Sequence, residues 1–416
     1  MKVISPSAVN GTITIIPSKS ISHRALVCSA LAKGTSTIQN IMFSEDIRAT
    51  ANALRDMGFC EYEYSAADSR CVVHGALGKV SRREIDCGES GSTLRFLIPL
   101  GLDGIERIFT GKGRLMRRPI SGYDKLFARN RVKYWKSEEE ITLCGLVEGG
   151  EYALRGDVSS QFITGLLFKF PLLFDDSGIH ITTELESKPY VEMTRDVQAL
   201  FGIHSYWDGN TIEVPGRQGY TAQEIEIEGD YSHAAFFAAA AAISGTVEIK
   251  GLRPASRQGD KEIMGILKCM GAQVVEDEKK TEVCKQMLKP IEVDVSQIPD
   301  LVPVLAVLGC AARGKTRIYN AARLRYKESD RLHAITVELE KLGAHITEYQ
   351  DSLLISGTGS LEGGTVNSHN DHRIAMALAV ASCIAKGDIV IEDAGCVAKS
   401  APRFYEEFKS LGGKVR

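Results

Sequence analysis

The sequence predicts an α/β fold built from six similar units, and three observations support this. Six segments begin with polar residues and continue into an apolar stretch; they start at residues 20, 91, 160, 232, 300 and 370, at intervals of 68 to 72 residues. A short alternating, β-type segment follows four of these stretches clearly and the other two less regularly. A charged, amphipathic second helix comes next. Each unit of about 70 residues is therefore mixed α/β, with a period too long for most solenoids or propeller blades.

The first helix of each unit is expected to be buried. These stretches are apolar on every side, and the fourth, residues 234–243, is mostly alanine. Helices without a polar face lie inside a protein, and small residues let their backbones approach closely. The second helices are expected to pack outside, against sheets, at residues 46–58, 261–271, 329–343 and 404–412, among others. Residues 3–16 are interpreted as strands that complete another unit; periodicity leaves open whether the six units form one ring or two groups of three.

Composition describes an ordinary globular protein and excludes several classes. The chain has 416 residues, 44% of them hydrophobic and 25% charged, with a net charge of −3. This charge does not favour nucleic-acid binding, and the longest apolar run is about half a membrane span. The ten cysteines lack zinc-binding spacing and favour buried thiols in a reducing compartment. Because no signal peptide is recognisable, we expect a cytoplasmic protein without nucleic-acid or membrane partners.

Candidate binding residues gather at the starts of the buried helices. They are Lys19, Ser20 and Arg24 in the first unit, Gly91 in the second, Ser159, Ser160 and Gln161 in the third, Asp300 in the fifth and Arg373 in the sixth. Free N–H groups at a helix start bind anions, and cations strengthen such a site. Simple N-capping explains any one Ser or Asp. It does not explain Lys19, Arg24 or Arg373, so we expect the starts to converge on an anionic ligand.

The segment 326–331, Tyr-Lys-Glu-Ser-Asp-Arg, has the densest charge of these candidates. Acidic residues are ordinary in a first helical turn, whereas Lys327 and Arg331 are disfavoured there because a helix start carries partial positive charge. A solvated charged cap would explain this segment in isolation. Its place in the repeat favours a shared anion site instead. An arginine run ending at Arg118 occupies the same place in the second unit.

No motif predicts nucleophilic catalysis, a phosphate-binding loop or a metal. The chain lacks Gly-x-Ser-x-Gly and the Gly-rich loop that ends in Lys-Ser/Thr. His369 and His372 have a spacing that could hold a metal, but no third ligand lies within reach in the sequence. We therefore predict a protein without a metal.

Taken together, these segments resemble the 5-enolpyruvylshikimate-3-phosphate synthases of the enolpyruvyl transferase family. The resemblance spans essentially the whole chain. It rests on the joint order of the segments 18–24, 118–119, 159–161, 187–190, 298–300, 327–331 and 371–373 and of Lys399. Each segment is a weak signal alone, and their combination in this order is highly specific.

The resemblance implies a two-domain inside-out α/β barrel with three βαβαββ-type units per domain. One domain would comprise residues 18–227, mainly on the shikimate 3-phosphate side, and the other residues 1–17 and 228–416, with the hinge near residues 17 and 228 and the active site in the cleft between them. The implied reaction transfers the enolpyruvyl group of phosphoenolpyruvate to the 5-hydroxyl of shikimate 3-phosphate through a tetrahedral intermediate and releases phosphate. This is the shikimate-pathway step towards chorismate and aromatic amino acids. It needs no cofactor, and a monomer is expected.

The resemblance also implies roles for individual residues. The catalytic residues would be Asp300, Glu328 and Lys19. Shikimate 3-phosphate would bind to Lys19, Ser20, Arg24, Ser159, Ser160, Gln161, Ser187, Asp300 and Lys327. Phosphoenolpyruvate would bind to Lys19, Gly91, Arg118, Gln161, Arg331, Arg373 and Lys399. The chemistry agrees, because a ligand with a phosphate and a carboxylate needs several cations, and two carboxylates in different surroundings can hold opposite protonation states.

Two departures from the family pattern and two alternatives remain. Residues 89–92 are Glu-Ser-Gly-Ser where the family often has Asn-Ala-Gly-Thr, which bears on the response to glyphosate, and Arg323 replaces an Asn that often contacts the shikimate phosphate. The first alternative is a UDP-N-acetylglucosamine enolpyruvyl transferase. It is disfavoured because residues 111–118 lack the Cys that its active-site loop usually carries. The second is a non-catalytic anion-binding protein on the same fold.

Overall fold

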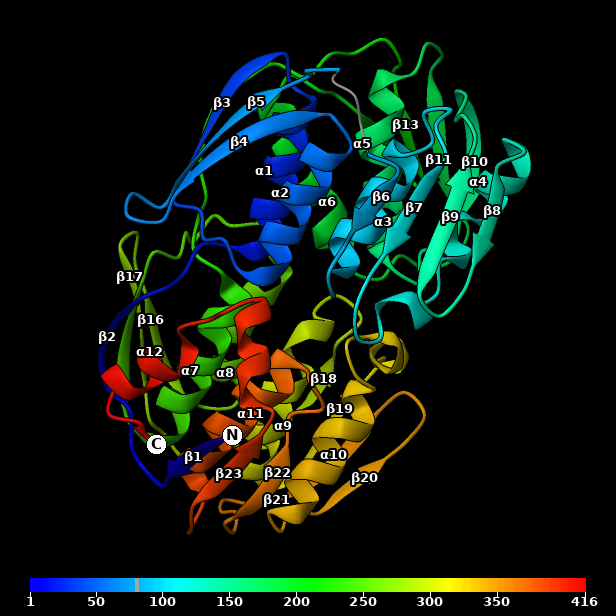
Figure 1. Cartoon of the computed structure of the whole chain (residues 1–416). Helices are drawn as coiled ribbons and strands as arrows, with labels where there is room; N and C mark the ends of the chain where they lie inside the picture. The colour runs from blue at the N-terminus through cyan, green and yellow to red at the C-terminus, as the bar shows by residue number, and fades with distance from the viewer. Residues whose placement is uncertain (79–81) are drawn as a thin grey trace. The chain divides into compact units, whose positions relative to one another are not determined.

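The computed structural model describes residues 1–78 and 82–416 (Figure 1). These residues contain six four-stranded sheets and twelve α-helices. They form two compact units. The N-terminal unit is Pro17–Ile227, and the C-terminal unit combines Met1–Ile16 with Glu228–Arg416. Each unit has three of the sheets and six of the helices. The predicted α/β class is confirmed.

In the N-terminal unit, each sheet contains one parallel and two antiparallel strand pairs. The first sheet, β14-β3-β5-β4, consists of Glu224–Glu226, Gly34–Gln39, Arg70–Gly75 and Cys60–Ser65. The second, β6-β7-β9-β8, consists of Glu84–Asp86, Arg107–Thr110, Glu140–Cys144 and Lys133–Lys136. The third, β10-β11-β13-β12, consists of Gly150–Leu154, Ser177–Ile181, Thr211–Val214 and Tyr206–Asp208. Because β14 pairs in parallel with β3, the last strand of this unit completes its first sheet.

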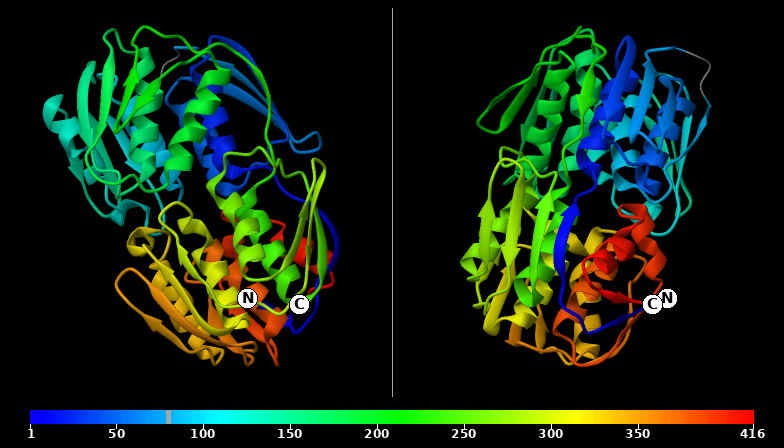
Figure 2. Two further views of the ribbon diagram at one scale, coloured as in Figure 1. Left: turned by 180° about the vertical axis from the view of Figure 1, so that it is seen from behind. Right: turned by 90° about the vertical axis from the view of Figure 1, so that its left-hand side faces the viewer.

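The C-terminal unit repeats this pattern. Its sheets are β16-β17-β15-β2 (Gln273–Glu276, Lys280–Cys284, Thr246–Lys250, Asn10–Thr14), β18-β19-β21-β20 (Glu292–Asp294, Arg313–Tyr319, Leu353–Thr358, Ile346–Glu348) and β22-β23-β1-β24 (Gly364–Asn367, Ile389–Glu392, Lys2–Ser5, Lys414–Val415). Strand β2 pairs in parallel with β15, and β1 pairs with β23 and β24. Residues 3–16 therefore complete two sheets of this unit, and both chain ends lie in one sheet (Figure 2).

Helices alternate between buried and amphipathic ones along the chain. The buried helices are α1 (Lys19–Leu31), α3 (Gly91–Leu100), α5 (Ser160–Lys169), α7 (Tyr231–Ser244), α9 (Val302–Ala311) and α11 (His372–Ala381). The second helices are α2 (Glu45–Asp56), α4 (Asp124–Arg129), α6 (Lys188–Leu200), α8 (Glu262–Cys269), α10 (Arg331–Lys341) and α12 (Phe404–Ser410). From Tyr231 to Ile243, α7 buries every residue except Ser232, which confirms the predicted burial of its alanine run.

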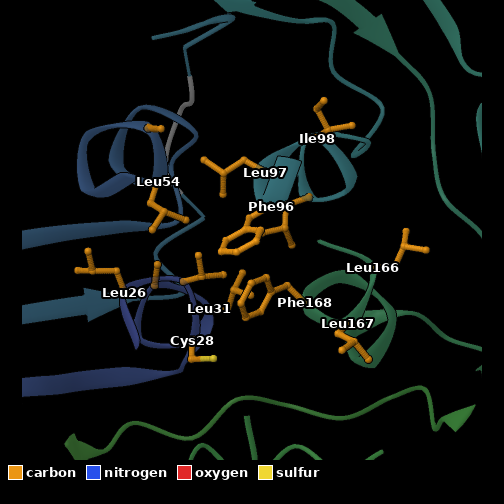
Figure 3. Packing of buried hydrophobic residues seen from close by; sticks show 14 of the residues in the cluster. Leu26, Cys28, Leu31, Leu54, Phe96, Leu97, Ile98, Leu166, Leu167 and Phe168 are labelled. Atoms are coloured by element: carbon orange, nitrogen blue, oxygen red, sulfur yellow. The ribbon is translucent and has the colours of Figure 1, made fainter. Parts of the chain in front are cut away.

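The core of the N-terminal unit forms where its buried helices meet (Figure 3). Phe96 of α3 and Phe168 of α5 are in edge-to-face contact with ring centroids 5.5 Å apart. Leu26 and Leu31 of α1 belong to the same cluster. Burying one such side chain contributes roughly 1.5–3 kcal/mol, so this cluster holds the three helix starts in a common frame.

Two helix starts differ from the prediction. The helix expected from residue 329 begins at Arg331, because Asp330 adopts extended backbone and its side chain accepts a hydrogen bond from the His333 N–H at 3.2 Å. Lys327 and Glu328 therefore precede α10 instead of lying in its first turn. Asp300 lies in a short 3-10 turn, Pro299–Leu301, just before α9. Within the described ranges, every helix is too short or too polar to cross a membrane.

Strand β21 approaches the end of α9 so closely that only glycine fits at Gly357. An added Cβ would lie 2.0 Å from the backbone oxygen of Ala312 and 2.1 Å from that of Gly309. These oxygens belong to a helix end that cannot move aside as a flexible side chain could. We expect Gly357→Ala to lower the free energy of unfolding by about 1–3 kcal/mol, as overpacking does. Chemical denaturation measures this change.

A matched control is Gly265→Ala on the exposed face of α8. Its added Cβ would make only an ordinary contact, 3.7 Å from Glu262 Oε2. Alanine also favours helix more than glycine does, so this variant should be as stable as the parent or slightly more stable. Equal stability of both variants would contradict the close packing inferred at Gly357.

Candidate active site

In the N-terminal unit, each buried helix starts with a serine cap. Ser18 Oγ accepts from the Ile21 N–H, Ser90 Oγ from the Thr93 N–H, and Ser159 Oγ from the Gln161 N–H. Each cap satisfies one helix N–H and leaves others free for a ligand. Residues predicted to bind substrates follow these caps directly, at Lys19, Gly91 and Ser160, and the cap Ser159 is itself one of the predicted residues.

Arg24 is a buried cation surrounded by neutral partners. Its side chain is 3% exposed. Nε donates to Thr194 Oγ1 at 2.8 Å, Nη1 to the Ser20 carbonyl at 2.7 Å and Nη2 to the Tyr190 carbonyl at 2.9 Å. Burial lowers the pKa of Arg24 to about 10. Among the described residues, the hydrogen-bond partners of Arg24 are all neutral oxygens. A buried cation in such surroundings is well suited to an anionic ligand.

Gly91, Arg118 and Gln161 come together, as the sequence predicts of one ligand site. A Cβ on Gly91 would lie 2.7 Å from Arg118 Nη1 and 3.6 Å from Gln161 Oε1. The Gln161 side chain donates to Ser92 Oγ at 3.0 Å and accepts from Arg95 Nη1 at 2.7 Å. Glycine at position 91 therefore lets the Arg118 guanidinium lie directly against the start of α3, one residue behind the Ser90 cap.

The remaining predicted residues of this unit occupy nearby helix starts. Lys19 Nζ forms an ion pair with Asp46 Oδ2 at 2.8 Å. Ser20 and Ser160 lie in the first turns of α1 and α5. Ser187 precedes α6, is buried and has a left-handed backbone with φ of 56°. That conformation is uncommon for a residue other than glycine and is found disproportionately at functional sites.

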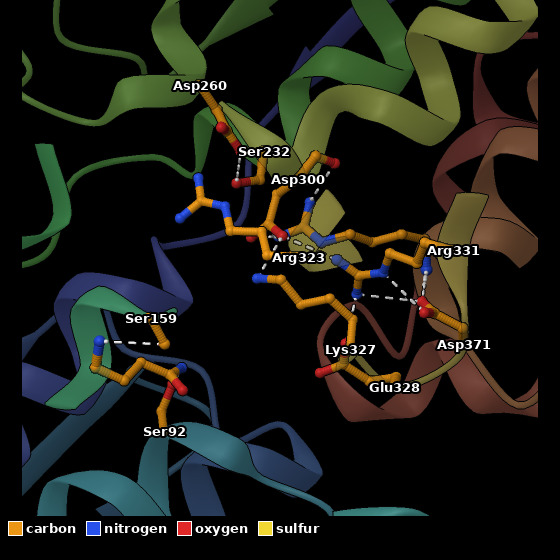
Figure 4. Close-up of polar contacts among 12 residues, drawn as sticks. Ser92, Ser159, Ser232, Asp260, Asp300, Arg323, Lys327, Glu328, Arg331 and Asp371 are labelled. Atoms are coloured by element: carbon orange, nitrogen blue, oxygen red, sulfur yellow. Dashed lines mark hydrogen bonds and ion pairs between the residues drawn. The ribbon is translucent and has the colours of Figure 1, made fainter. Parts of the chain in front are cut away.

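In the C-terminal unit, Arg331 is the centre of the charged cluster (Figure 4). Its side chain is 1% exposed. Nε donates to Asp371 Oδ2 at 2.8 Å, Nη1 to Asp300 Oδ1 at 2.8 Å and Nη2 to Glu328 Oε2 at 2.7 Å. Burial opposes its charge, but the three carboxylates outweigh burial and raise the pKa of Arg331. One guanidinium therefore fixes both carboxylates that the sequence predicts to be catalytic.

Asp300 is held by further cations. Arg373 Nη2 donates to Asp300 Oδ2 at 2.9 Å, and Lys327 Nζ lies 3.6 Å from Asp300 Oδ1. Burial alone would raise the pKa of the Asp300 carboxyl, but Arg373, Lys327 and Arg331 outweigh it and hold this pKa well below its ordinary value. Burial also lowers the pKa of Lys327 to about 8, aided by nearby cations and opposed by Asp300.

Lys399 and Arg323 each bond to a backbone carbonyl. Lys399 is buried at the end of the 3-10 helix Ala394–Lys399, and its Nζ donates to the Asn370 carbonyl at 2.7 Å, beside the start of α11. Arg323 donates from Nη2 to the Ser296 carbonyl. Across the described residues, no group of three or more His, Cys, Asp or Glu could hold a metal ion. His369 instead contacts Glu338, Nε2 to Oε1, at 2.7 Å.

The sequence did not single out three residues that belong to these clusters. Arg95 binds Gln161, and its only sequence signal was its position one turn after Gly91. Asp371 caps α11 and also binds Arg331 and Ser329. Asp260 accepts from Ser232, and burial, with Asp300 nearby, raises the pKa of Asp260 to about 7. The sequence includes Asp371 only as part of the segment 371–373, without a role of its own, and Asp260 lies in no motif.

Comparisons with known proteins agree along the whole chain. The family profile described as EPSP synthase (3-phosphoshikimate 1-carboxyvinyltransferase) matches residues 3–408. A 3-phosphoshikimate 1-carboxyvinyltransferase of Clostridium perfringens (strain 13 / Type A) is 45% identical over 422 residues, which cover 100% of this chain and 99% of the relative. One of Clostridium kluyveri is 46% identical over 419 residues, which cover 99% of this chain and 97% of the relative.

Solved structures share the fold. The EPSP synthase from Acinetobacter baumannii aligns with a TM-score of 0.81 and 26% identity over 100% of this chain and 99% of its own. The enolpyruvyl transferase NikO from Streptomyces tendae aligns with a TM-score of 0.80 at 17% identity, over 100% of this chain and 98% of its own, and shows the fold alone. The expected family and two-domain fold are confirmed: the chain belongs to the EPSP synthase family, whose named members here are 3-phosphoshikimate 1-carboxyvinyltransferases.

Proposed function

We propose that this protein transfers the enolpyruvyl group of phosphoenolpyruvate to the 5-hydroxyl of shikimate 3-phosphate and releases phosphate. The observation that carries this proposal beyond family membership is the pair of carboxylates, Asp300 and Glu328, held by one buried guanidinium of Arg331. The reaction moves one proton from a hydroxyl and one to and from a vinyl carbon. Two positioned carboxylates supply that chemistry without a metal or an organic cofactor.

The two compact units are, in this proposal, the two domains of the enzyme, with the hinge near residues 17 and 228. Substrates draw groups from both units. The enzyme works as a monomer in the cytoplasm. The thiol state supports this compartment, because the ten cysteines are free in the structure and disulfides are rare in reducing compartments.

Shikimate 3-phosphate takes its anchoring contacts from the N-terminal unit. Arg24 supplies a buried positive charge whose present partners are neutral. The hydroxyls at the starts of α1, α5 and α6 supply hydrogen bonds, and Lys327 and Asp300 complete the site. The site residues in this proposal are Lys19, Ser20, Arg24, Ser159, Ser160, Gln161, Ser187, Asp300 and Lys327.

Phosphoenolpyruvate needs cations for both its phosphate and its carboxylate. The Arg118 guanidinium, held against Gly91 and near Gln161, suits an oxygen of one of these groups. The site residues in this proposal are Lys19, Gly91, Arg118, Gln161, Arg331, Arg373 and Lys399. Because every nitrogen of the Arg331 guanidinium binds a carboxylate, Arg331 acts mainly through its charge and by fixing Asp300 and Glu328.

The reaction proceeds in two stages. Asp300 accepts the 5-hydroxyl proton as the oxygen bonds to C2 of phosphoenolpyruvate, while Glu328 gives a proton to C3; the product is the tetrahedral intermediate. Glu328, deprotonated in the first stage, then takes a proton from C3 as the C2–O bond to phosphate breaks, which restores the double bond and releases phosphate. Lys19 stabilises developing negative charge. The low pKa of the Asp300 carboxyl makes Asp300 a weak base by itself. Bound substrate anions offset the surrounding cations, which raises this pKa and makes Asp300 a stronger base.

The direct test measures phosphate release from phosphoenolpyruvate with shikimate 3-phosphate as the acceptor. We expect release with this acceptor and none with UDP-N-acetylglucosamine. Release only with the second acceptor would establish the alternative transferase. No release with either acceptor would support the non-catalytic anion-binding protein.

Glu328→Gln should reduce kcat about 10²- to 10⁴-fold, the usual contribution of a general acid or base. Substrate affinity should change little, because an amide oxygen can still accept from Arg331 Nη2. Asp330→Asn is the matched control: Asn caps a helix as well as Asp does, so its kcat should match that of the parent. A wild-type rate for Glu328→Gln would eliminate Glu328 as the proton donor.

Arg24→Ala should raise the KM for shikimate 3-phosphate about 10- to 100-fold, since a bond to a charged group contributes about 1.5–3 kcal/mol. The KM for phosphoenolpyruvate should change much less. The control is Arg195→Ala on α6, because Arg195 also donates to neutral oxygens, those of Ser205, at 2.8 and 2.7 Å. Equal weakening of both substrates by Arg24→Ala would count against the proposed division of the site.

A further inference from the structure

Four buried side chains form a continuous hydrogen-bonded chain through the N-terminal unit. His23 Nδ1 lies 2.7 Å from Thr50 Oγ1, Thr50 Oγ1 lies 2.6 Å from Thr93 Oγ1, and Thr93 Oγ1 donates to Ser90 Oγ at 2.8 Å. His23 and Ser90 are 1% exposed, and the two threonines are fully buried. The chain joins α1, α2 and α3 and ends on the serine that caps α3. We call it the histidine chain.

The direction of the histidine chain follows from counting hydrogens. A hydroxyl has one hydrogen, and that of Thr93 goes to Ser90. Thr50 has two acceptors for its one hydrogen, Thr93 Oγ1 at 2.6 Å and the Asp46 carbonyl at 3.4 Å, and the shorter bond to Thr93 takes it. His23 then donates from Nδ1 to Thr50. Nε2 then carries no hydrogen, which agrees with its lack of a hydrogen-bond partner among the described residues. Burial, with Lys19 and Arg24 nearby, holds the pKa of His23 well below its ordinary value and keeps the ring neutral.

A second chain leads to Arg24 and is separate from the first. Thr194 Oγ1 accepts from Arg24 Nε at 2.8 Å and donates to the Tyr190 carbonyl at 2.9 Å. Thr164 Oγ1 lies 2.9 Å from Thr194 Oγ1. Both threonines are fully buried, and the chain joins α1, α5 and α6. We call it the arginine chain. Among the described residues, the hydrogen bonds of the arginine chain and those of the histidine chain share no side chain.

We propose that the two chains position the two substrate subsites independently. The histidine chain sets the start of α3, and with it the place of Gly91 against the Arg118 guanidinium that would bind phosphoenolpyruvate. The arginine chain orients the Arg24 guanidinium for the phosphate of shikimate 3-phosphate. This inference rests on the proposed function and adds positioning residues, Thr50 and Thr194, that contact neither substrate.

The geometry favours positioning over general packing. Ser90 Oγ accepts both the N–H and the O–H of Thr93, at 3.1 and 2.8 Å, so the chain acts on the cap directly before Gly91. In the arginine chain, Thr194 Oγ1 accepts the Nε–H of Arg24. The carbonyls of Ser20 and Tyr190 accept from Nη1 and Nη2, so the three bonds together fix the direction of the guanidinium. Removing one hydroxyl leaves a buried donor without its partner, which costs more than the bond itself contributes.

The experiment compares Thr50→Val with Thr194→Val, two identical changes of nearly constant volume at fully buried positions. We expect Thr50→Val to raise the KM for phosphoenolpyruvate about tenfold, the effect of one lost buried hydrogen bond, and to change the KM for shikimate 3-phosphate less than about twofold. We expect Thr194→Val to show the opposite pattern. Thr50→Ser and Thr194→Ser keep the hydroxyl and should restore both KM values.

The crossed pattern is a readout that a merely structural role would not produce, because general loosening would weaken both substrates in both variants. Parallel changes in the two KM values, or no change in either, would overturn the inference. The proposed function would still hold if the wild-type enzyme is active. An inactive wild-type enzyme would overturn both. Should Thr50→Val fail to fold, Thr93→Val cuts the histidine chain at its next link, and the same crossed pattern is required.

Discussion

The burial of helices that have no polar face is the constraint on which the rest of this structure depends. Such helices can be covered only by sheets and by other helices, as α7 is over almost its whole length. Their polar starts then become the place where unpaired N–H groups, hydroxyls and charges collect. The caps Ser18, Ser90 and Ser159 each accept a hydrogen bond from one of these N–H groups. The N–H groups, hydroxyls and charges that the caps do not satisfy can bind anionic substrates.

The two units differ in the charge that surrounds their buried arginines. In the N-terminal unit Arg24 is buried among neutral oxygens, so its charge is available to an anion. In the C-terminal unit Arg331 is buried among three carboxylates and fixes Asp300 and Glu328. Removing one partner of such a buried pair is strongly destabilising. One unit is therefore suited to anchoring phosphate, and the other to moving protons.

Much of the candidate site was accessible from the sequence because helix starts follow a regular spacing. Gly91, Gln161 and Arg118 were predicted for one ligand site, and the structure brings them together. The predicted start of the nearby helix at residue 329 was wrong, since Asp330 caps the helix and Arg331 is its first residue. Whether a polar residue before an apolar run is the cap or lies outside the helix depends on backbone angles, which periodicity does not report.

By itself the sequence determined the α/β class, the buried and amphipathic helices and the family, because these follow from local periodicity and from motifs in a characteristic order. Only the tertiary structure decided which charges meet. Arg95, Asp260 and Asp371 became functional candidates through contacts with residues 28 to 66 positions away. The chain from His23 to Ser90 likewise joins three helices. Electrostatics and hydrogen bonding act over a few ångströms in space, and the sequence alone does not reveal those distances.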